Sequence, residues 1–190
     1  MKLLALTASP RKEGNTELLL RSFLDGIESA GWETETIRLN DLNYRPCQAC
    51  DRCAPTGKCV VQDDMQLLYP KIIACKALVL VTPIYFGSLS AQLKMYIDRF
   101  QCWWHAKYNL NKPFILPEEE RPAYFLTVGA LKNKEYSESA RKIVGVYCHI
   151  VNLKLRGSLC FRGYDEPGSI AGEPKNLEKA FQDGVAFATE

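Results

Sequence analysis

The chain has 190 residues, 47% of them hydrophobic and 24% charged, with a formal net charge of +2 at pH 7. This length suits one domain with a full hydrophobic core, and the small charge, without a run of Lys or Arg, argues against a nucleic-acid partner. The longest wholly apolar runs are about five residues, far below the ~20 that span a membrane. We therefore expect a cytoplasmic protein of one domain, residues 1–190, that contacts no membrane.

The first thirty residues have the pattern of a strand, a polar loop and a helix. The apolar run Lys2–Thr7 predicts a strand, and apolar residues at helical spacing from Leu20 to Ile27 predict a helix that ends near Gly31. Asn15 is expected to be the N-cap of this helix. The amino end of a helix carries free N–H groups and a partial positive charge, so the loop before it favours an anion.

This first loop carries side chains that suit a phosphate group. Ser9, Asn15 and Thr16 provide neutral donors, and Arg11 provides a planar cation that matches phosphate oxygens. The loop has neither the lysine of a nucleotide-triphosphatase loop nor the glycines of a dinucleotide fingerprint. Residues of these types also favour turns, so a loop that only caps the helix remains the alternative.

Four further strands are expected along the chain, at residues 33–39, 77–82, 123–128 and 153–161. Helices are expected at 63–74, 89–100 and 137–151, and a last helix begins at Pro174. A capping box formed by Asp63 and Gln66 should open the second helix, and Pro70 should kink or break it. Strands that alternate with helices imply an α/β fold with a five-stranded parallel sheet covered on both faces.

The hydrophobic patterns also predict the order of the strands. Those near Leu4, Val79 and Leu126 are apolar throughout, as burial on both faces requires. Those near Thr36 and Leu155 alternate with charged residues, as edge strands can. The doubly wound order 2-1-3-4-5 satisfies both patterns, and in it the ligand site lies beyond the carboxyl ends of strands 1 and 3.

Three loops should therefore meet at this edge of the sheet: Thr7–Thr16, Pro83–Ser88 and Val128–Ala130. The second loop contains Tyr85 and Phe86 next to Gly87, where the backbone can approach a flat ligand closely. A flat aromatic ring with one phosphate tail suits this set, and FMN is the natural candidate. Aromatic residues after a strand are also common core residues, which is the alternative for this pair.

Eight cysteines are many for this length, and half of them are clustered. Four, which we call the Cys quartet, lie within thirteen residues of a Pro- and Gly-containing loop at 40–62: Cys47, Cys50, Cys53 and Cys59. Single cysteines among apolar residues are usually buried and bind no metal, which is what we expect of Cys75, Cys102, Cys148 and Cys160. Nothing marks the chain as secreted, so we expect a metal or redox role for the quartet rather than structural disulfides.

Several segments, taken in order, resemble one family. Residues 9–16 resemble the phosphate loop of the flavodoxin-like NAD(P)H-dependent FMN reductases, and residues 82–87 with 90–99 resemble the second flavin loop and the helix after it. The spacing of the Cys quartet, followed by residues 60–65, is similar to the cysteine motif of the iron–sulfur flavoproteins in that superfamily. Two positions depart from the family pattern: Ala8 stands where Gly is common, and no glycine pair is found around Gly129.

The resemblance implies a single flavodoxin-like domain that binds FMN. It implies that the phosphate is held by Ser9, Arg11, Asn15 and Thr16. It also implies that the isoalloxazine ring is lined by Pro83, Ile84, Tyr85, Phe86, Gly87 and Gly129. The chemistry would be that of the flavin, without an acid–base triad of the protein, and His105 and His149 are expected to be structural or surface residues.

Three states of the Cys quartet remain open: ligands of a [4Fe-4S] cluster, reduced thiols or a labile disulfide beside the flavin, and ligands of zinc. We expect an FMN-dependent oxidoreductase, with or without a cluster as relay. Its electron donor would be NAD(P)H or a ferredoxin-type protein, and its acceptor a small molecule or a protein.

Other functions suit the same pattern. One is an NAD(P)H-dependent FMN or quinone reductase without a cluster, and another is a non-enzymatic thiol or metal sensor on the same fold. Trp103 and Trp104 are candidates for a lid over the flavin or for the contact of a homo-oligomer, since large aromatic residues are enriched at interfaces. We expect a homo-oligomer.

Overall fold

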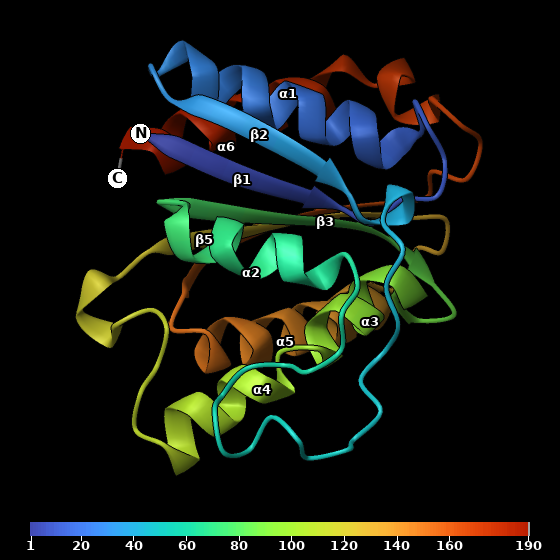
Figure 1. Ribbon diagram of the computed structural model, residues 1–190. Coiled ribbons are helices and arrows are strands. Elements are labelled where there is room, and N and C mark those ends of the chain that lie inside the picture. Colours follow the sequence, from blue (N-terminus) through green and yellow to red (C-terminus); the bar gives the residue numbers. More distant parts are fainter. Residues whose placement is uncertain (190) are drawn as a thin grey trace.

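Five parallel strands form the centre of the computed structural model, which describes residues 1–189 (Figure 1). They are β1 (Lys2–Thr7), β2 (Glu33–Arg38), β3 (Ala77–Tyr85), β5 (Pro122–Gly129) and β6 (Lys154–Arg162). Their order across the sheet is β2-β1-β3-β5-β6, and each neighbouring pair is parallel. The α/β class and the parallel sheet are thereby confirmed, as is the position of the two charged strands, β2 and β6, at the edges.

The predicted strand count needs correction. A two-residue strand, β4 (Ser88–Leu89), folds back antiparallel onto the end of β3, so the sheet has six strands. The order 2-1-3-4-5 is therefore wrong as numbered, since the fourth and fifth parallel strands are β5 and β6. The cause is local: Phe86 and Gly87 both have positive φ angles, 48° and 76°. Two such residues in succession make the tight turn of a β-hairpin.

Helices cover both faces of the sheet (Figure 1). On one face lie α1 (Asn15–Ser29) and α6 (Pro174–Thr189), and on the other α2 (Met65–Ala74), α3 (Ala91–Asp98) and α5 (Lys134–Ile150). The short helix α4 (Gln101–Trp104) continues into a π-helical turn, η2 (His105–Asn109). Single 3-10 turns are η1 (Leu39–Asp41), η3 (Pro117–Glu119) and η4 (Ser169–Gly172).

Four helix starts differ from the sequence prediction, and one of them is that of α3, which begins at Ala91 rather than residue 89 because Ser88–Leu89 form β4. Gly14, not Asn15, is the N-cap of α1. Helix α2 begins at Met65 rather than at Asp63. The expected capping box is absent because the side-chain amide of Gln66 donates instead to backbone carbonyls of the preceding loop, among them that of Val61 (2.7 Å). Helix α2 also runs through Pro70 without a break. Helix α5 begins three residues before the predicted start, because the side chain of Asn133 caps it by accepting from a backbone N–H.

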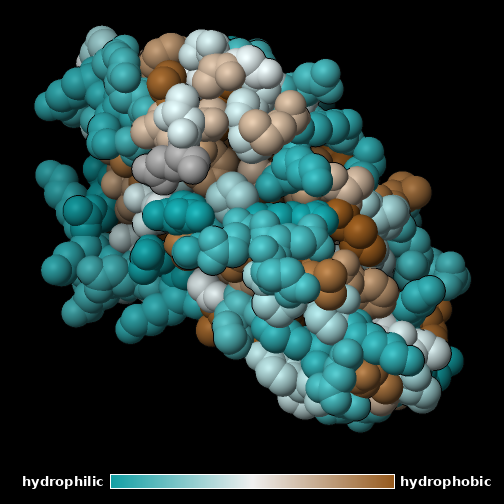
Figure 2. Space-filling model, turned by 90° about the vertical axis from the view of Figure 1, so that its left-hand side faces the viewer, coloured by the Kyte–Doolittle hydropathy of each residue, from teal (hydrophilic) through white to brown (hydrophobic). Residues whose placement is uncertain are grey.

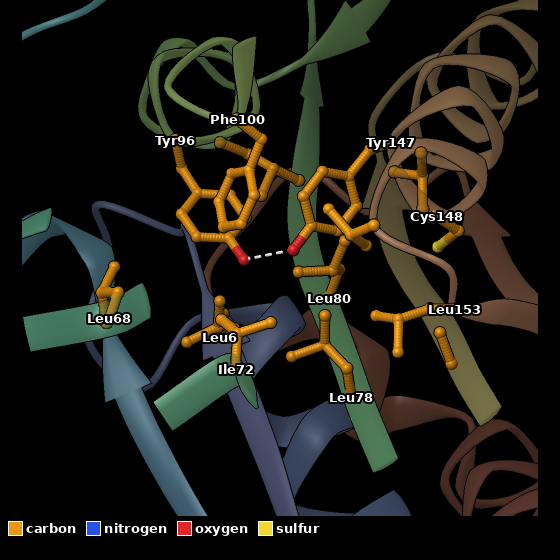
Figure 3. Close-up of a cluster of buried hydrophobic side chains, with 14 of the residues drawn as sticks. Leu6, Leu68, Ile72, Leu78, Leu80, Tyr96, Phe100, Tyr147, Cys148 and Leu153 are labelled. Carbon is orange, nitrogen blue, oxygen red and sulfur yellow. Dashed lines mark hydrogen bonds between the residues drawn. The ribbon is translucent and has the colours of Figure 1, made fainter. Parts of the chain in front are cut away.

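A separate hydrophobic core fills each face of the sheet. The core under α2, α3 and α5 contains two fully buried tyrosines, Tyr96 and Tyr147, whose hydroxyl oxygens lie 2.5 Å apart (Figure 3). Burial raises the pKa of both phenols well above the ordinary value. Each hydroxyl is thus neutral, and the hydrogen bond between them satisfies polar atoms that would otherwise be unpaired in the core.

The amino ends of the strands lie on the side of the molecule opposite to the candidate ligand edge (Figure 1). Figure 2 shows that side, on which hydrophilic residues predominate and hydrophobic residues occur in small groups. Among residues 1–189, none of the helices is both long and apolar enough to cross a membrane.

Helices α1 and α6 touch backbone to backbone at a pair of glycines. A Cβ atom placed on Gly26 of α1 would lie 2.1 Å from the carbonyl oxygen of Phe181, and one placed on Gly184 of α6 would lie 2.1 Å from that of Phe23. Real Cβ atoms do not approach backbone oxygen this closely, so only glycine permits the contact.

This contact makes Gly184 sensitive to substitution. Gly184→Ala should lower the free energy of unfolding by about 1–3 kcal/mol, because the two helices must separate. The matched control is Gly145→Ala in α5, where an added Cβ would have no neighbour within 4 Å. It should be neutral or stabilising by up to about 1 kcal/mol, from helix propensity. Urea denaturation of both variants measures the difference, and equal midpoints would contradict the proposed helix contact.

Candidate functional site

A pocket lies at the carboxyl ends of β1, β3 and β5, where the direction of winding reverses. It encloses about 510 Å³, including its open mouth. Its lining residues come from four loops: Ser9, Arg11, Gly14, Asn15, Thr16, Pro83, Ile84, Tyr85, Val128, Gly129, Ala130, Tyr164 and Asp165. Eight of the ten flavin-site residues predicted from the sequence are in this set, and Phe86 and Gly87 are not.

The first loop presents uncommitted polar groups to the pocket. Thr16 is 3% exposed, and its hydroxyl has no hydrogen-bond partner among residues 1–189. The first N–H groups of α1 have no acceptor within the helix. Gly14 caps the helix and has no side chain, so neither Ser9 nor Thr16 acts as the cap. No side chain of this loop therefore caps the helix, and phosphate binding by Ser9 and Thr16 stays a prediction.

Arg11 and Asn15 bind a segment far along the chain. The guanidinium of Arg11 donates to the carbonyl of Asp165 (3.0 Å), and the amide of Asn15 donates to that of Glu166 (2.9 Å) and accepts from the N–H of Ile170 (3.1 Å). Both polar ends of the Asn15 side chain are thus used to fix the loop before α6. Its role as a direct phosphate ligand remains a prediction.

The same C-terminal loop adds residues that the sequence analysis missed. Tyr164 and Asp165 line the pocket, and both lie in the turn-rich stretch after β6. The backbone N–H groups of Gly163 and Tyr164 donate to the carbonyl of Gly129 at 2.8 and 3.2 Å. The signals in the sequence are the turn-rich composition and a weak resemblance of residues 163–181 to the family, and neither reveals the partner.

The second loop divides at the hairpin turn. Pro83, Ile84 and Tyr85 line the pocket, whereas the side chain of Phe86 is fully exposed. Gly87 packs on the ring of Tyr136, since a Cβ placed there would lie 3.0 Å from it. Phe86 and Gly87 form the tight turn and are not among the lining residues, so their predicted contact with the flavin ring stays a prediction.

A network of buried hydroxyl groups supports the pocket from below. The hydroxyl of Ser90 donates to the carbonyl of Ala8 (3.0 Å) and lies 3.1 Å from that of Thr82. The hydroxyl of Thr127 donates to the carbonyl of Thr82 (2.7 Å). These bonds join the ends of β1, β3 and β5, so they fix the points from which the pocket loops depart.

One carboxylate lies near the helix end and is neutralised there. Glu17, in the first turn of α1, forms an ion pair with Arg38 of β2. Arg38 also donates to the carbonyl of Ser9 (3.3 Å). An unpaired carboxylate would oppose anion binding at this helix end, so the pair with Arg38 keeps the site suitable for phosphate.

Taken together, these groups make a pocket with two chemically different ends. Thr16, Arg11 and the amino end of α1 form a polar, positively charged end. The other side is apolar and is formed by Pro83, Ile84 and Gly129. Gly129 packs closely on Ile84, since a Cβ placed on it would come within 3.1 Å of that side chain. The residues present fit a flat ring with an anionic tail.

The Cys quartet lies in a long irregular loop, residues 43–64, which we call the Cys loop. Cys50 is exposed, and hydrogen bonds from the backbone and side chain of Arg52 lower the pKa of its thiol. Burial raises the pKa of the Cys53 thiol, and nearby thiolate charges add to the shift, with Cys59 ahead of Cys47 and Cys50. The four thiols are therefore electrostatic neighbours.

The side chains of the quartet do not form a site for a single metal ion. Across residues 1–189, no three Cys, His, Asp or Glu side chains converge as one such ion requires. A cluster takes one thiolate at each iron, so its binding by the four predicted ligands stays a prediction. Of the scattered thiols, Cys75, Cys102 and Cys148 are buried as predicted, which raises their pKa values to about 11, 11 and 12, and Cys160 is partly buried.

Neither histidine is in the pocket. His105 is buried and its Nδ1 pairs with the amide of Asn109 (2.8 Å), while Nε2 of His149 lies 3.0 Å from the hydroxyl of Tyr108. Trp103 is 4% exposed and packs in the core, so it is neither a lid nor a surface contact. The predicted homo-oligomer stays a prediction.

Comparison with known proteins identifies the family. The model of the NADPH-dependent FMN reductase family matches residues 1–155. An iron-sulfur flavoprotein of Methanocaldococcus jannaschii is 44% identical over 99 residues, which are 52% of this chain and 51% of that protein. An iron-sulfur flavoprotein of Methanosarcina thermophila is 35% identical over 99 residues, 52% of each chain. These matches therefore span about half the length of either relative.

Solved structures share the fold at low sequence identity. An NAD(P)H:quinone oxidoreductase from Methanothermobacter marburgensis superposes with a TM-score of 0.75 at 20% identity, covering 97% of this chain and 96% of the other. An FMN-dependent NADH-azoreductase from Bacillus anthracis, in complex with FMN, gives 0.75 at 13% identity, covering 99% and 100%. The fold is flavodoxin-like, as the resemblance implied, and with its family model matched over residues 1–155 the chain belongs to the NADPH-dependent FMN reductase family.

Proposed function

We propose that the protein is an FMN-dependent oxidoreductase that accepts electrons from NAD(P)H. The observation that supports this most is the two-ended pocket at the switch point of the sheet, in a chain of this family. FMN has the matching shape: a flat ring system joined to one phosphate by a flexible chain. A ferredoxin-type donor, the identity of the acceptor and a cytoplasmic location remain predictions.

Each part of the pocket has a role in this proposal. The free N–H groups of α1, the hydroxyls of Ser9 and Thr16 and the guanidinium of Arg11 would bind the phosphate. Pro83, Ile84 and the loop at Gly129 would hold the ring and exclude water from one side of it. FMN, when bound, supplies the two-electron chemistry, and the protein supplies position and hydrogen bonds.

The pairing of Arg11 and Asn15 with the C-terminal loop also has a role. The carbonyls that they bind lie at the edge of the pocket, so these two side chains hold Tyr164 and Asp165 in the lining. The other terminal nitrogen of Arg11 is available for phosphate, since the hydrogen bond to Asp165 uses Nη1 only. Arg11 can thus serve the loop and the ligand together.

A [4Fe-4S] relay is a second candidate, favoured by the iron-sulfur flavoproteins among the relatives. Four cysteines in thirteen residues supply enough thiolates for a cluster. No three potential ligands among residues 1–189 converge on one point, which disfavours a single zinc ion but does not test a cluster, in which each thiolate binds a separate iron. The alternative is a reductase without a cluster, in which the four cysteines are free thiols.

The first prediction tests the function itself. The purified full chain should show resolved flavin absorption bands and should oxidise NADPH or NADH under anaerobic conditions when an artificial electron acceptor is added. A colourless protein that cannot be loaded with FMN would contradict the proposal. Retained FMN without any NAD(P)H oxidation would instead favour the sensor or a ferredoxin-type donor.

The second prediction concerns the phosphate end of the pocket. Arg11→Ala and Thr16→Ala should each weaken FMN binding by roughly ten- to a hundredfold, the effect of losing a hydrogen bond to a charged group. Arg21→Ala is the control, since Arg21 is an exposed arginine of α1 outside the pocket. Fluorescence titration of the apo-protein with FMN measures the change. Equal affinities of all three variants and the wild type would show that the loop does not bind phosphate.

The third prediction decides between the two kinds of flavoprotein. If a cluster is present, anaerobically purified protein contains iron and acid-labile sulfide, and Cys→Ala at any member of the Cys quartet abolishes both without loss of FMN. Cys160→Ala, at a partly buried thiol of β6, should retain iron and FMN. Wild-type protein with FMN but neither iron nor sulfide excludes the relay.

A further inference from the structure

The Cys loop is closed at its neck. The backbone N–H of Asn43 donates to the carboxylate of Asp64 (2.7 Å), and the N–H of Asp64 donates to the carbonyl of Asn43 (3.2 Å). The N–H of Arg45 donates to the carboxylate of Asp63 (3.1 Å). The two ends of this 22-residue loop are therefore adjacent.

One buried side chain lies across this neck. Arg99 follows helix α3 and is 2% exposed. Its Nη1 donates to the carbonyl of Arg45 (2.8 Å) and to the carboxylate of Asp63 (2.5 Å), and its Nη2 donates to the sulfur of Cys59 (3.4 Å). A single guanidinium thus contacts the start of the loop, its end and one member of the Cys quartet.

We propose that Arg99 is the positioning residue of the Cys loop: it joins the two ends and fixes the sulfur of Cys59 at the end of α3. Arginine suits this task because its planar fork offers five donors in fixed directions, whereas lysine offers one compact charge. Removing the guanidinium would leave the carbonyl of Arg45 and the sulfur of Cys59 without this donor, and the carboxylate of Asp63 without its cationic partner. The loop would then detach from α3.

Other contacts divide the Cys loop into an anchored half, residues 53–64, and a freer half, residues 43–52. The amide of Gln66 donates to the carbonyl of Cys59 (3.1 Å), and Gly57 packs against Ala106, where a Cβ would lie only 2.7 Å from its side chain. Cys53 and Cys59 both pack against the hydrophobic core, while Cys50 is exposed. Arg99 completes the anchored half and makes Cys59 the fixed thiol of the quartet.

This role is independent of the proposed function. Arg99 is not among the residues that line the FMN pocket, and its contacts to Arg45 and Asp63 involve no member of the Cys quartet. If Arg99 does not position the Cys loop, the proposal that the pocket binds FMN still stands. If the pocket does not bind FMN, the proposed role of Arg99 still stands.

Limited trypsin digestion of the purified full chain, with whatever it binds, tests the proposal. The loop contains two exposed cleavage positions, after Arg52 in the freer half and after Lys58 next to Cys59. Cleavage of a native protein requires local opening around the site. Arg99→Met should accelerate cleavage after Lys58 by about tenfold or more, relative to sites outside the loop, because the anchored half is released.

The variant Arg99→Lys separates positioning from charge. Its ammonium group can pair with Asp63 and preserve the melting temperature, but it cannot bind Arg45, Asp63 and Cys59 at once. It should therefore show a melting temperature near that of the wild type together with fast cleavage after Lys58. If lysine restores slow cleavage as well, Arg99 is only a charge partner and the proposal is overturned. Should Arg99→Met fail to fold, the lysine variant alone decides.

Arg121→Met is the matched control. The guanidinium of Arg121 is also largely buried and holds two carbonyls, those of Ile73 and Cys75, together with the carboxylate of Glu119. Its loss should destabilise the protein without selective cleavage after Lys58. Equal acceleration in the Arg121 and Arg99 variants, or wild-type cleavage in both Arg99 variants, would contradict the proposal.

Discussion

The hydroxyl network beneath the pocket is the constraint on which the rest of the site depends. Thr82, Ser90 and Thr127 are buried, and a buried hydroxyl without a partner costs about 1–3 kcal/mol. Their mutual bonds, and the bond to the carbonyl of Ala8, are possible only if β1, β3 and β5 end at one level. The irregular loops that follow these three strands therefore begin at fixed positions.

Two parts of the molecule then use buried arginine and asparagine side chains in the same way, to tie distant backbone segments together. Asn15 joins the first loop to the segment before α6, and Arg99 joins the two ends of the Cys loop. Each side chain offers several polar atoms in a rigid plane, so it can satisfy several backbone groups at once. Loops without regular structure gain a defined shape by this means.

The sequence reveals the features that depend on local pattern. Burial on both faces made β1, β3 and β5 apolar throughout, and this gave their central position and the convergence of the three loops. The turn at Phe86 and Gly87 was missed, because a non-glycine residue with positive φ leaves little trace in the sequence. The partners of Asn15 and Arg99 were missed for another reason. They lie 151 to 155 residues from Asn15 and 36 to 54 residues from Arg99, and no periodicity encodes such pairs.

The bonds between the first loop and the segment before α6 bear on the order in which the protein is made. During synthesis the first loop leaves the ribosome long before residues 165–170, to which Arg11 and Asn15 bind. A nascent chain that has completed β1 to β5 therefore has the helix end for a phosphate but lacks one wall of the pocket. The pocket is therefore complete only once this late segment has been made, and a polypeptide cut short before residue 164 would have the first loop and the helix end without that wall.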